Sequence, residues 1–307
     1  MFRITAALAS ATLVVAGVAL IASTSPAAAA AADQSCTSIP IFETDGYHAA
    51  PTAATYQDYN RRVPAGYTAR PVYYDGGIFP FVDARALDNA IADGTARLTA
   101  AVREFHAACP STRIIITGYS EGALVAGDTL ANFSKTDEIP HDLLRGVLYS
   151  DARREVGDGG RAGRAGGIET SIPSFLPGVT MQGPRGFGDL LVHSICNEND
   201  GICNSANFFT NAPAFLNGLV GYATGAHVYD KDPVRDQGNG QTLVRQNPVV
   251  PYGPSLPLAI DNPYQLQQRL GITPTLFTTT IEQALSKLPG GNQILAQPWV
   301  RIALGKY

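Results

Sequence analysis

The chain has 307 residues and a formal net charge of −4, and its basic residues are scattered apart from a small arginine group between positions 153 and 164. This distribution excludes a nucleic-acid partner, which would require a basic patch or stripe. No segment after the first 32 residues is apolar throughout a length that could span a membrane, so we expect the mature chain to be soluble and to form one large domain.

The first 32 residues are typical of an export signal. A short basic start is followed by an apolar run from Ile4 to about Ile21, and small residues then offer cleavage options near Ala30 or Ala32. The apolar run is also long enough for an uncleaved membrane anchor. We expect a secreted protein, with attachment to the cell envelope as the alternative, and one folded domain over residues 33–260.

The next segments predict alternating strands and helices. Short apolar runs at Ile39 to Phe42 and Pro71 to Tyr74 are predicted strands, and apolar residues from Ala84 to Ala107 recur at helical spacing. The β-branched run from Arg113 to Thr117 predicts a strand that is buried on both faces. This alternation favours the α/β class, with a mostly parallel central sheet flanked by helices.

The strongest local signal is the pentapeptide Gly118-Tyr119-Ser120-Glu121-Gly122, which stands between a predicted strand and a predicted helix. A G-x-S-x-G sequence in this context exposes its serine on a sharp turn, and the glycines let strand and helix pass closely. The backbone N–H of Glu121, at the helix start, is expected to donate to a developing oxyanion. Ser120 is therefore the predicted nucleophile, and a merely structural Gly-Ser turn is the alternative.

Two more strands are predicted at Gly146 to Ser150 and Leu190 to Ile195, and an acidic loop follows the second. Asp200 lies in this loop between Cys196 and Cys203, and a disulfide there would hold its carboxylate in place. Asp200 is therefore the expected acid of a catalytic triad. Glu198 and Asp151 are the lesser candidates, and an ordinary Asp-Gly turn is the structural alternative.

A serine nucleophile needs a histidine base, and in this fold class the chain order is serine, acid, histidine. The histidines that follow Ser120 are His141, His193 and His227. We favour His227, because it follows a glycine-bearing loop, where a triad histidine belongs. His141 is expected at the solvated surface and His193 within a buried strand.

An apolar group separates the expected acid from the expected base. Its aromatic and aliphatic residues could flank the nucleophile and bind an acyl chain, or they could belong to the core. We expect the following side chains to contact the substrate: Tyr119, Phe208, Phe209, Phe215 and Leu219. Farther on, residues 261–307 contain helix-like segments at Tyr264 to Leu270 and Thr275 to Leu288, which predict a helical extension packed on the domain.

Four cysteines follow the signal, and in an exported chain they are expected to form disulfides. Of the three possible connectivities, proximity favours Cys196 with Cys203, which leaves Cys36 with Cys109. Their spacing lacks the paired C-x-x-C pattern of structural zinc sites, so we expect no metal and no cofactor.

Together these residues resemble the cutinase-like serine esterases of carbohydrate esterase family 5, in their actinobacterial form. The resemblance covers about residues 36–235 and rests on the cysteines, on Gly118 to Ala123, on Asp200 and on Gly225 to Tyr229. It implies a single α/β-hydrolase domain, a triad of Ser120, Asp200 and His227, and both disulfides.

The sequence departs from this family at two places. The family usually has Gln after the nucleophile, whereas this chain has Glu121. The family also carries a Gly-Ser/Thr-x-Glu loop after the first strand, and here that place has Phe42 to Gly46. We take the backbone of Thr44 as the candidate for the second oxyanion donor.

We therefore expect a secreted, monomeric serine esterase that hydrolyses lipid-like or polymeric esters with apolar acyl chains through an acyl-enzyme. Transient contact with a lipid surface or with the cell envelope is expected. One alternative keeps the chemistry but changes the role, giving an envelope mycolyl esterase or an acyltransferase. Another is a catalytically inert envelope-binding protein on the same scaffold.

Overall fold

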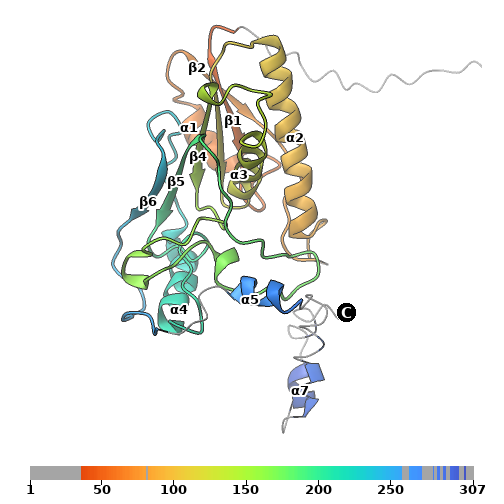
Figure 1. Ribbon diagram of the computed structural model, residues 1–307, viewed down its shortest axis with the longest axis vertical. Helices are drawn as coiled ribbons and strands as arrows, with labels where there is room; N and C mark the ends of the chain where they lie inside the picture. Colours follow the sequence, from red (N-terminus) through yellow and green to blue (C-terminus); the bar gives the residue numbers. More distant parts are fainter. Residues whose placement is uncertain are drawn as a thin grey trace, which may run out of the picture. The chain divides into compact units, whose positions relative to one another are not determined.

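A parallel sheet of six strands, in the order β2-β1-β3-β4-β5-β6, lies at the centre of the computed structural model (Figure 1). The strands are β1 (Ile39–Thr44), β2 (Tyr67–Pro71), β3 (Ile114–Tyr119), β4 (Leu144–Tyr149), β5 (Leu191–Asn197) and β6 (Gly240–Val244). This architecture confirms the predicted α/β class with a mostly parallel sheet. Because all strands are parallel, their carboxyl ends meet at one edge, where α/β proteins place their functional residues.

The structure describes residues 36–80, 82–257, 263–271, 279, 282–283, 286–287, 291–296 and 301. The predicted export signal lies outside the described residues, and so does most of the predicted helix from Thr275 to Leu288. Within the described residues, no helix combines the length and the hydropathy that a membrane span requires.

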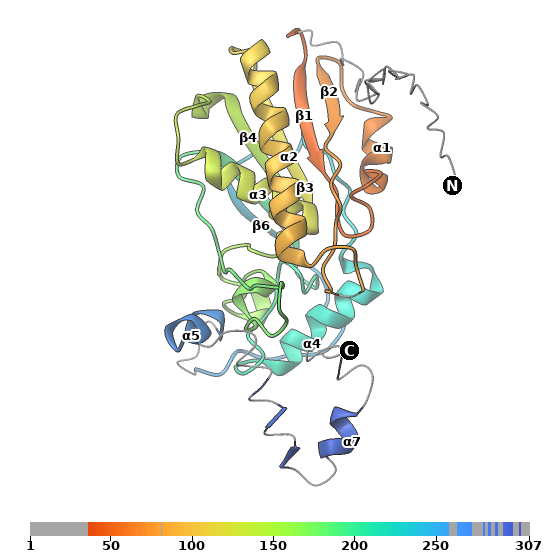
Figure 2. The same ribbon diagram turned by 90° about the vertical axis from the view of Figure 1, so that its right-hand side faces the viewer.

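Helices cover both faces of the sheet. Helices α2 (Leu87–Ala108) and α3 (Glu121–Phe133) lie on one face, and α1 (Gln57–Asn60) packs on the other through Tyr59. The remaining helices are α4 (Ala212–Gly221), α5 (Pro263–Arg269) and α7 (Gly291–Leu295). Single 3₁₀ turns occur at Ala54–Tyr56, His141–Leu143, Gly160–Ala162 and Ile168–Thr170, and a π-helical turn, η5, spans Tyr222–Ala226. Figure 2 shows α2 and α3 side by side over one face of the sheet.

Strand β3 sends alternate isoleucines into two separate cores. Ile114 and Ile116 pack with the buried stripe of α2, which includes Leu98 and Phe105. Ile115 points to the opposite face. Burial on both faces explains why the sequence of this strand is an unbroken β-branched run rather than an alternating one.

Both edge strands differ from the sequence-based expectation. The second strand was predicted at Pro71 to Tyr74, but β2 ends at Pro71. Strand β6 (Gly240–Val244) was not predicted at all. Most residues of both strands remain partly or largely exposed, so neither contains the apolar run that reveals a buried strand.

Helix α5 contacts the main body through specific polar bonds. The Gln267 side chain accepts a hydrogen bond from the backbone N–H of Ser174 at 2.6 Å and donates to the Ser174 carbonyl oxygen at 2.7 Å. Tyr264 is buried in the same core as α2 and α3. Helix α5 therefore packs on the domain, and the predicted helical extension over residues 261–307 stays a prediction.

Candidate active site

Ser120 stands in a strained conformation between β3 and α3. Its φ of 57° and ψ of −122° lie in a region that non-glycine residues rarely adopt, and such strain is typical of functional sites. The backbone N–H of Ser120 donates to the Tyr149 carbonyl oxygen at 2.9 Å, and the Ser120 carbonyl oxygen accepts from the Ala123 N–H at 2.9 Å. These two bonds hold the turn in place.

The two glycines of the pentapeptide are required by close backbone contacts. A Cβ atom on Gly118 would lie 2.1 Å from the Gly122 carbonyl oxygen. A Cβ atom on Gly122 would lie 2.2 Å from the Thr44 carbonyl oxygen, at the end of β1. The G-x-S-x-G pattern thus lets β1, β3 and α3 converge around Ser120, as the sequence predicted.

His227 reaches Ser120 from the end of α4. The helix continues through η5, where Gly225 leaves helical geometry with a φ of 104°, and His227 follows directly. Its Nε2 atom lies 2.9 Å from Ser120 Oγ. The Tyr119 hydroxyl donates to the His227 carbonyl oxygen at 2.6 Å, so the residue before the serine also holds the histidine.

Asp200 lies behind the imidazole and is fully buried. Its Oδ2 atom lies 2.9 Å from His227 Nδ1, and its Oδ1 atom accepts from the Ile202 N–H at 3.0 Å. The hydroxyls of Ser150 and Tyr229 also donate to Oδ2, at 2.6 and 2.7 Å. The structure therefore brings Ser120, His227 and Asp200 together in hydrogen-bond reach. The sequence had suggested no role for the Ser150 and Tyr229 hydroxyls, although Tyr229 lies in the Gly225 to Tyr229 segment.

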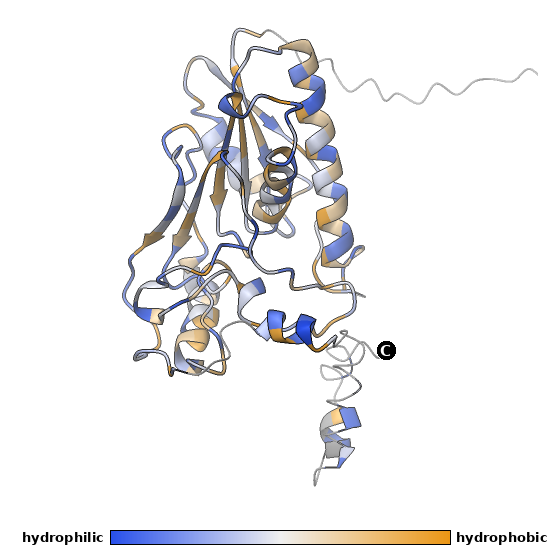
Figure 3. Cartoon of the chain, viewed as in Figure 1, coloured by the Kyte–Doolittle hydropathy of each residue, from blue (hydrophilic) through white to orange (hydrophobic). Residues whose placement is uncertain are grey.

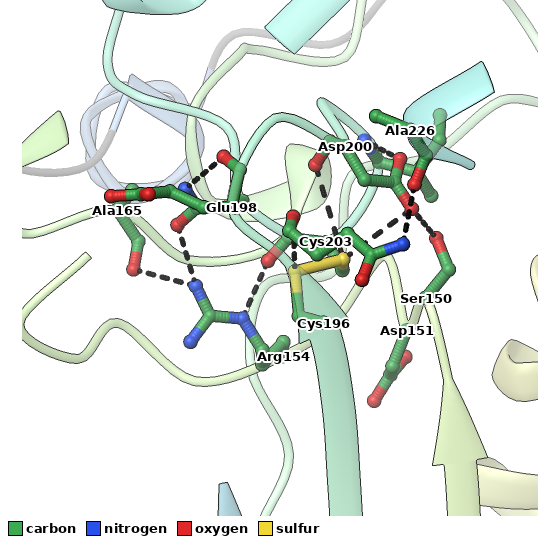
Figure 4. The surroundings of a disulfide bond; sticks show 12 residues. Ser150, Asp151, Arg154, Ala165, Cys196, Glu198, Asp200, Cys203 and Ala226 are labelled. Atoms are coloured by element: carbon green, nitrogen blue, oxygen red, sulfur yellow. Dashed lines mark hydrogen bonds between the residues drawn. A yellow bond between two sulfur atoms is a disulfide. The ribbon is translucent and has the colours of Figure 1, made fainter. Parts of the chain in front are cut away.

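The Cys196–Cys203 disulfide closes the loop that carries Asp200 (Figure 4). Buried Arg154 fixes the same loop by donating from Nε to the Cys203 carbonyl oxygen at 2.5 Å. The second disulfide joins Cys36 to Cys109, so the predicted pairing is confirmed. Within the described part of the chain, no group of three His, Cys, Asp or Glu residues could hold a metal ion.

The lesser candidates have other partners. Asp151 pairs with Arg185 at 2.9 Å, and Glu198 pairs with Arg161 at 3.2 Å and Arg245 at 3.0 Å. Burial opposes the ionisation of Glu198, but the hydrogen bonds to its carboxylate outweigh burial and lower its pKa to about 2. These contacts leave Asp200 as the carboxylate that faces His227.

The two remaining histidines also lie elsewhere. His141 Nδ1 lies 2.5 Å from Asp189 Oδ1, and hydrogen bonds to its ring raise the pKa of His141. His193 on β5 bonds the Asp236 carbonyl oxygen and the Thr242 hydroxyl. Of the three histidines considered, His227 is the one that meets Ser120.

Glu121 is a buried carboxyl at the first turn of α3, with 3% of its surface exposed. Its Oε1 atom accepts from the Gly77 N–H at 3.0 Å, whereas Oε2 is buried and has no hydrogen-bond partner among the described residues. Burial raises the pKa of Glu121 to about 7. Near neutral pH the carboxyl is therefore protonated in a large fraction of molecules, and in that form it resembles the neutral amide that the family usually has here.

Thr44 is fully buried next to the turn that carries Ser120. Its hydroxyl lies within hydrogen-bond distance of the carbonyl oxygens of Gly122, at 2.8 Å, and Thr117, at 3.2 Å. The hydroxyl is therefore occupied by backbone, and the proposed role of the Thr44 backbone as an oxyanion donor stays a prediction. The residue of this loop that stands beside Ser120 is Gly46, whose added Cβ would lie 3.0 Å from Ser120 Cβ. The sequence had not singled out Gly46.

Comparisons with known proteins agree with this geometry. A model of the Cutinase family matches residues 36–218. A carboxylesterase Culp6 homologue of Corynebacterium glutamicum is 38% identical over 165 residues, which are 46% of this chain and 53% of that protein. The chain thus spans about half the length of this curated relative.

Solved structures of low sequence identity were also found. An acetylxylan esterase is 18% identical, with 66% of this chain and 99% of that chain covered and a TM-score of 0.41. A cutinase-like protein from Cryptococcus sp. is 18% identical, with 66% and 96% covered and a TM-score of 0.37. Both likenesses are too weak to support a functional conclusion by themselves.

Proposed function

This chain belongs to the cutinase family, and from that premise we propose that it is a secreted serine esterase that hydrolyses carboxylic esters with apolar acyl chains. The observation that carries the proposal is the continuous path from Ser120 Oγ through the imidazole of His227 to Asp200, with 2.9 Å at each step. A serine hydroxyl is a weak nucleophile unless a base receives its proton, and this arrangement supplies that base.

The geometry supports a two-step mechanism. Ser120 Oγ attacks the ester carbonyl carbon while His227 Nε2 accepts the hydroxyl proton and Asp200 stabilises the resulting imidazolium. The imidazolium then protonates the leaving alcohol, and an acyl-enzyme remains on Ser120. Water, deprotonated by His227, attacks the acyl-enzyme, and the imidazolium returns the proton to Ser120 Oγ as the acid leaves. The N–H of Glu121 is the proposed donor to the oxyanion in both steps.

Helix α4 offers the surface for an apolar acyl chain, since it leads directly to His227 through η5. Leu216, Leu219 and Val220 lie on its exposed side, and Phe208 and Phe209 are exposed just before it. Figure 3 shows hydrophobic colouring along much of α4. Of the proposed acyl-binding residues, Phe215 is half-buried and contacts the Phe208 ring, with centroids 5.6 Å apart. The same exposed apolar side chains would also allow brief contact of the protein with a lipid surface.

Export is supported by the disulfides. Both pairs of cysteines are bonded, and such bonds persist in oxidising compartments outside the cytosol. We propose that the mature protein acts as a monomer outside the cell or at its envelope, without a nucleic-acid partner and without a cofactor.

Hydrolysis of p-nitrophenyl esters over a range of acyl lengths tests the proposed activity. We expect turnover by the purified mature protein and its loss in Ser120→Ala, by a factor of about 10⁶ in kcat. Ser134→Ala, at the opposite end of α3, is the matched control and should retain activity. Equal rates for wild type and Ser120→Ala at every acyl length would reject the esterase.

Two further assays separate the alternatives. An envelope acyltransferase would transfer the acyl group to a sugar alcohol in competition with water, so exclusive release of free acid counts against transfer. An inert binding protein would not carry an activated serine. The Ser120 to His227 distance supports activation, and rapid labelling of Ser120 by a fluorophosphonate would exclude the inert form.

A further inference from the structure

Three donor groups converge on a single oxygen of Asp200. His227 Nδ1, the Tyr229 hydroxyl and the Ser150 hydroxyl lie 2.9, 2.7 and 2.6 Å from Oδ2. Asp200 and Ser150 are fully buried, and Figure 4 shows the Ser150 side chain directed at the carboxylate. Because water does not reach this place, these hydroxyls take over the solvation of the charge.

The bond pattern permits one consistent placement of protons. An ionised carboxylate only accepts, so Ser150 and Tyr229 must donate to it. The Tyr229 oxygen in turn accepts from the Asn197 N–H at 2.9 Å. Having donated its proton, the Ser150 oxygen turns a lone pair towards His227 Nδ1, which lies 3.1 Å away. The Nδ1 proton is thus shared between Asp200 and Ser150, and Nε2 is left as the acceptor for Ser120.

Ser150 occupies, after β4, the position that Ser120 occupies after the neighbouring strand β3. Both serines follow the last residue of a strand, and both have a φ of 57°. Ser120 donates its N–H to the Tyr149 carbonyl oxygen, and Ser150 donates its N–H to the Ile195 carbonyl oxygen at 3.0 Å. A left-handed conformation at a non-glycine residue is costly and persists where its surroundings impose it. Here it turns the hydroxyl into the space between Asp200 and His227.

We propose that Ser150, together with Tyr229, is a positioning residue that fixes the Asp200 carboxylate and the Nδ1-protonated form of His227. This inference rests on the proposed esterase function, since it assigns Ser150 a role through His227 and not on the substrate. Loss of either hydroxyl would leave the buried carboxylate with fewer donors, and the imidazole bonded to it would be held less firmly. The chemical step should then slow while ester binding stays unchanged.

The chain offers matched controls for both hydroxyls. Ser194 on the neighbouring strand β5 is buried, and among the described residues its hydroxyl has no hydrogen-bond partner; the same holds for the Tyr59 hydroxyl. Ser150→Ala is therefore compared with Ser194→Ala, and Tyr229→Phe with Tyr59→Phe. We expect kcat to fall about 10- to 100-fold in the first member of each pair, with KM unchanged, and to stay near wild type in the second.

Proton NMR supplies a readout that a purely structural role would not move. The low-field resonance of the His227 Nδ1 proton should shift in Ser150→Ala and keep its position in Ser194→Ala. Wild-type kcat and an unmoved resonance in both Ser150→Ala and Tyr229→Phe would overturn the inference. If Ser150→Ala does not fold, Tyr229→Phe decides alone. Failure of the proposed function is read separately, as equal rates in wild type and Ser120→Ala.

Discussion

The two sides of Ser120 are built in different ways. On the acid side, Asp200 is fully buried, its two oxygens accept four hydrogen bonds, and a disulfide closes its loop. On the opposite side, Glu121 keeps a buried oxygen without a partner among the described residues. Asp200 thus holds the imidazole of His227 in position, while the Glu121 side retains one unsatisfied buried oxygen.

This contrast fits different roles for the different parts of the site. A proton relay requires fixed positions within a few tenths of an ångström, which demands packed and bonded side chains. The exposed face of α4, which we propose binds the acyl chain, needs exposed carbon instead, and that exposure costs stability. Changes on the acid side should therefore affect kcat, changes at Glu121 should affect pH dependence, and changes on the exposed face of α4 should affect substrate choice.

The largest expected effect comes from Asp200→Asn, which removes the charge and presents the imidazole with the wrong partner. We expect kcat to fall about 10⁴-fold with the fold intact, measured with a short-chain ester. Glu198→Gln, in the same cysteine-closed loop, is the control and should keep kcat within about threefold. A larger loss in Glu198→Gln than in Asp200→Asn would mean that the acid has been wrongly assigned.

The two disulfides should separate stability from catalysis. Their sequence separations are 7 and 73, so chain entropy predicts losses of about 2.5 kcal/mol for Cys196→Ala with Cys203→Ala and about 4.5 kcal/mol for Cys36→Ala with Cys109→Ala. We expect kcat to fall only in the first pair, because that pair carries Asp200. Urea unfolding and ester turnover measure the two quantities, and a kcat loss confined to the second pair would contradict the comparison.

Glu121→Gln should change how stability depends on pH. Burial raises the pKa of Glu121 from 4.5 to about 7 in the folded protein, so the folded state loses stability as pH rises from about 4.5 to 7 and regains none above. The variant lacks this loss, and its advantage should be near zero at pH 4.5 and reach up to about 3 kcal/mol above pH 7.

Glu43 and Glu169 also have pKa values raised by burial, to about 8 and about 7, but both remain in the variant. Urea unfolding of wild type and Glu121→Gln at several pH values therefore isolates the contribution of Glu121. Glu104→Gln, at an exposed position of α2, is the control. A constant difference between wild type and Glu121→Gln across this pH range would show that Glu121 does not titrate there.

The smallest expected effect concerns the acyl chain. Leu219 is 42% exposed on α4, and Leu219→Ser should raise KM about 3- to 10-fold for long-chain esters and leave acetyl esters unaffected. Leu266 on α5 is similarly exposed, at 43%, so Leu266→Ser is a matched control. An equal change of KM for acetyl and long-chain esters would remove α4 from the acyl-binding surface.

The sequence predicted the parts of the site that have a local pattern. The pentapeptide at 118–122 and the cysteine frame around Asp200 each carry a chemical requirement within a few residues. Ser150 and Tyr229 were assigned no role, although Tyr229 lies in the Gly225 to Tyr229 segment, because their contacts with Asp200 form only when β4, β5 and the His227 loop meet. Strand β6 was missed for a related reason, since an exposed edge strand lacks an apolar run.

Gly225 lies between the proposed acyl-binding helix α4 and the proposed base His227. It ends the helical path of α4 and η5 with a φ of 104°, and nothing lies within 4 Å of where its Cβ would be. A substitution there would act only through backbone strain and not through a clash. The backbone thus runs from α4 through Gly225 to His227, which follows two residues after Gly225. Deuterium exchange across residues 222–228, with and without lipid vesicles, would test whether contact of a lipid surface with α4 changes the backbone that precedes His227.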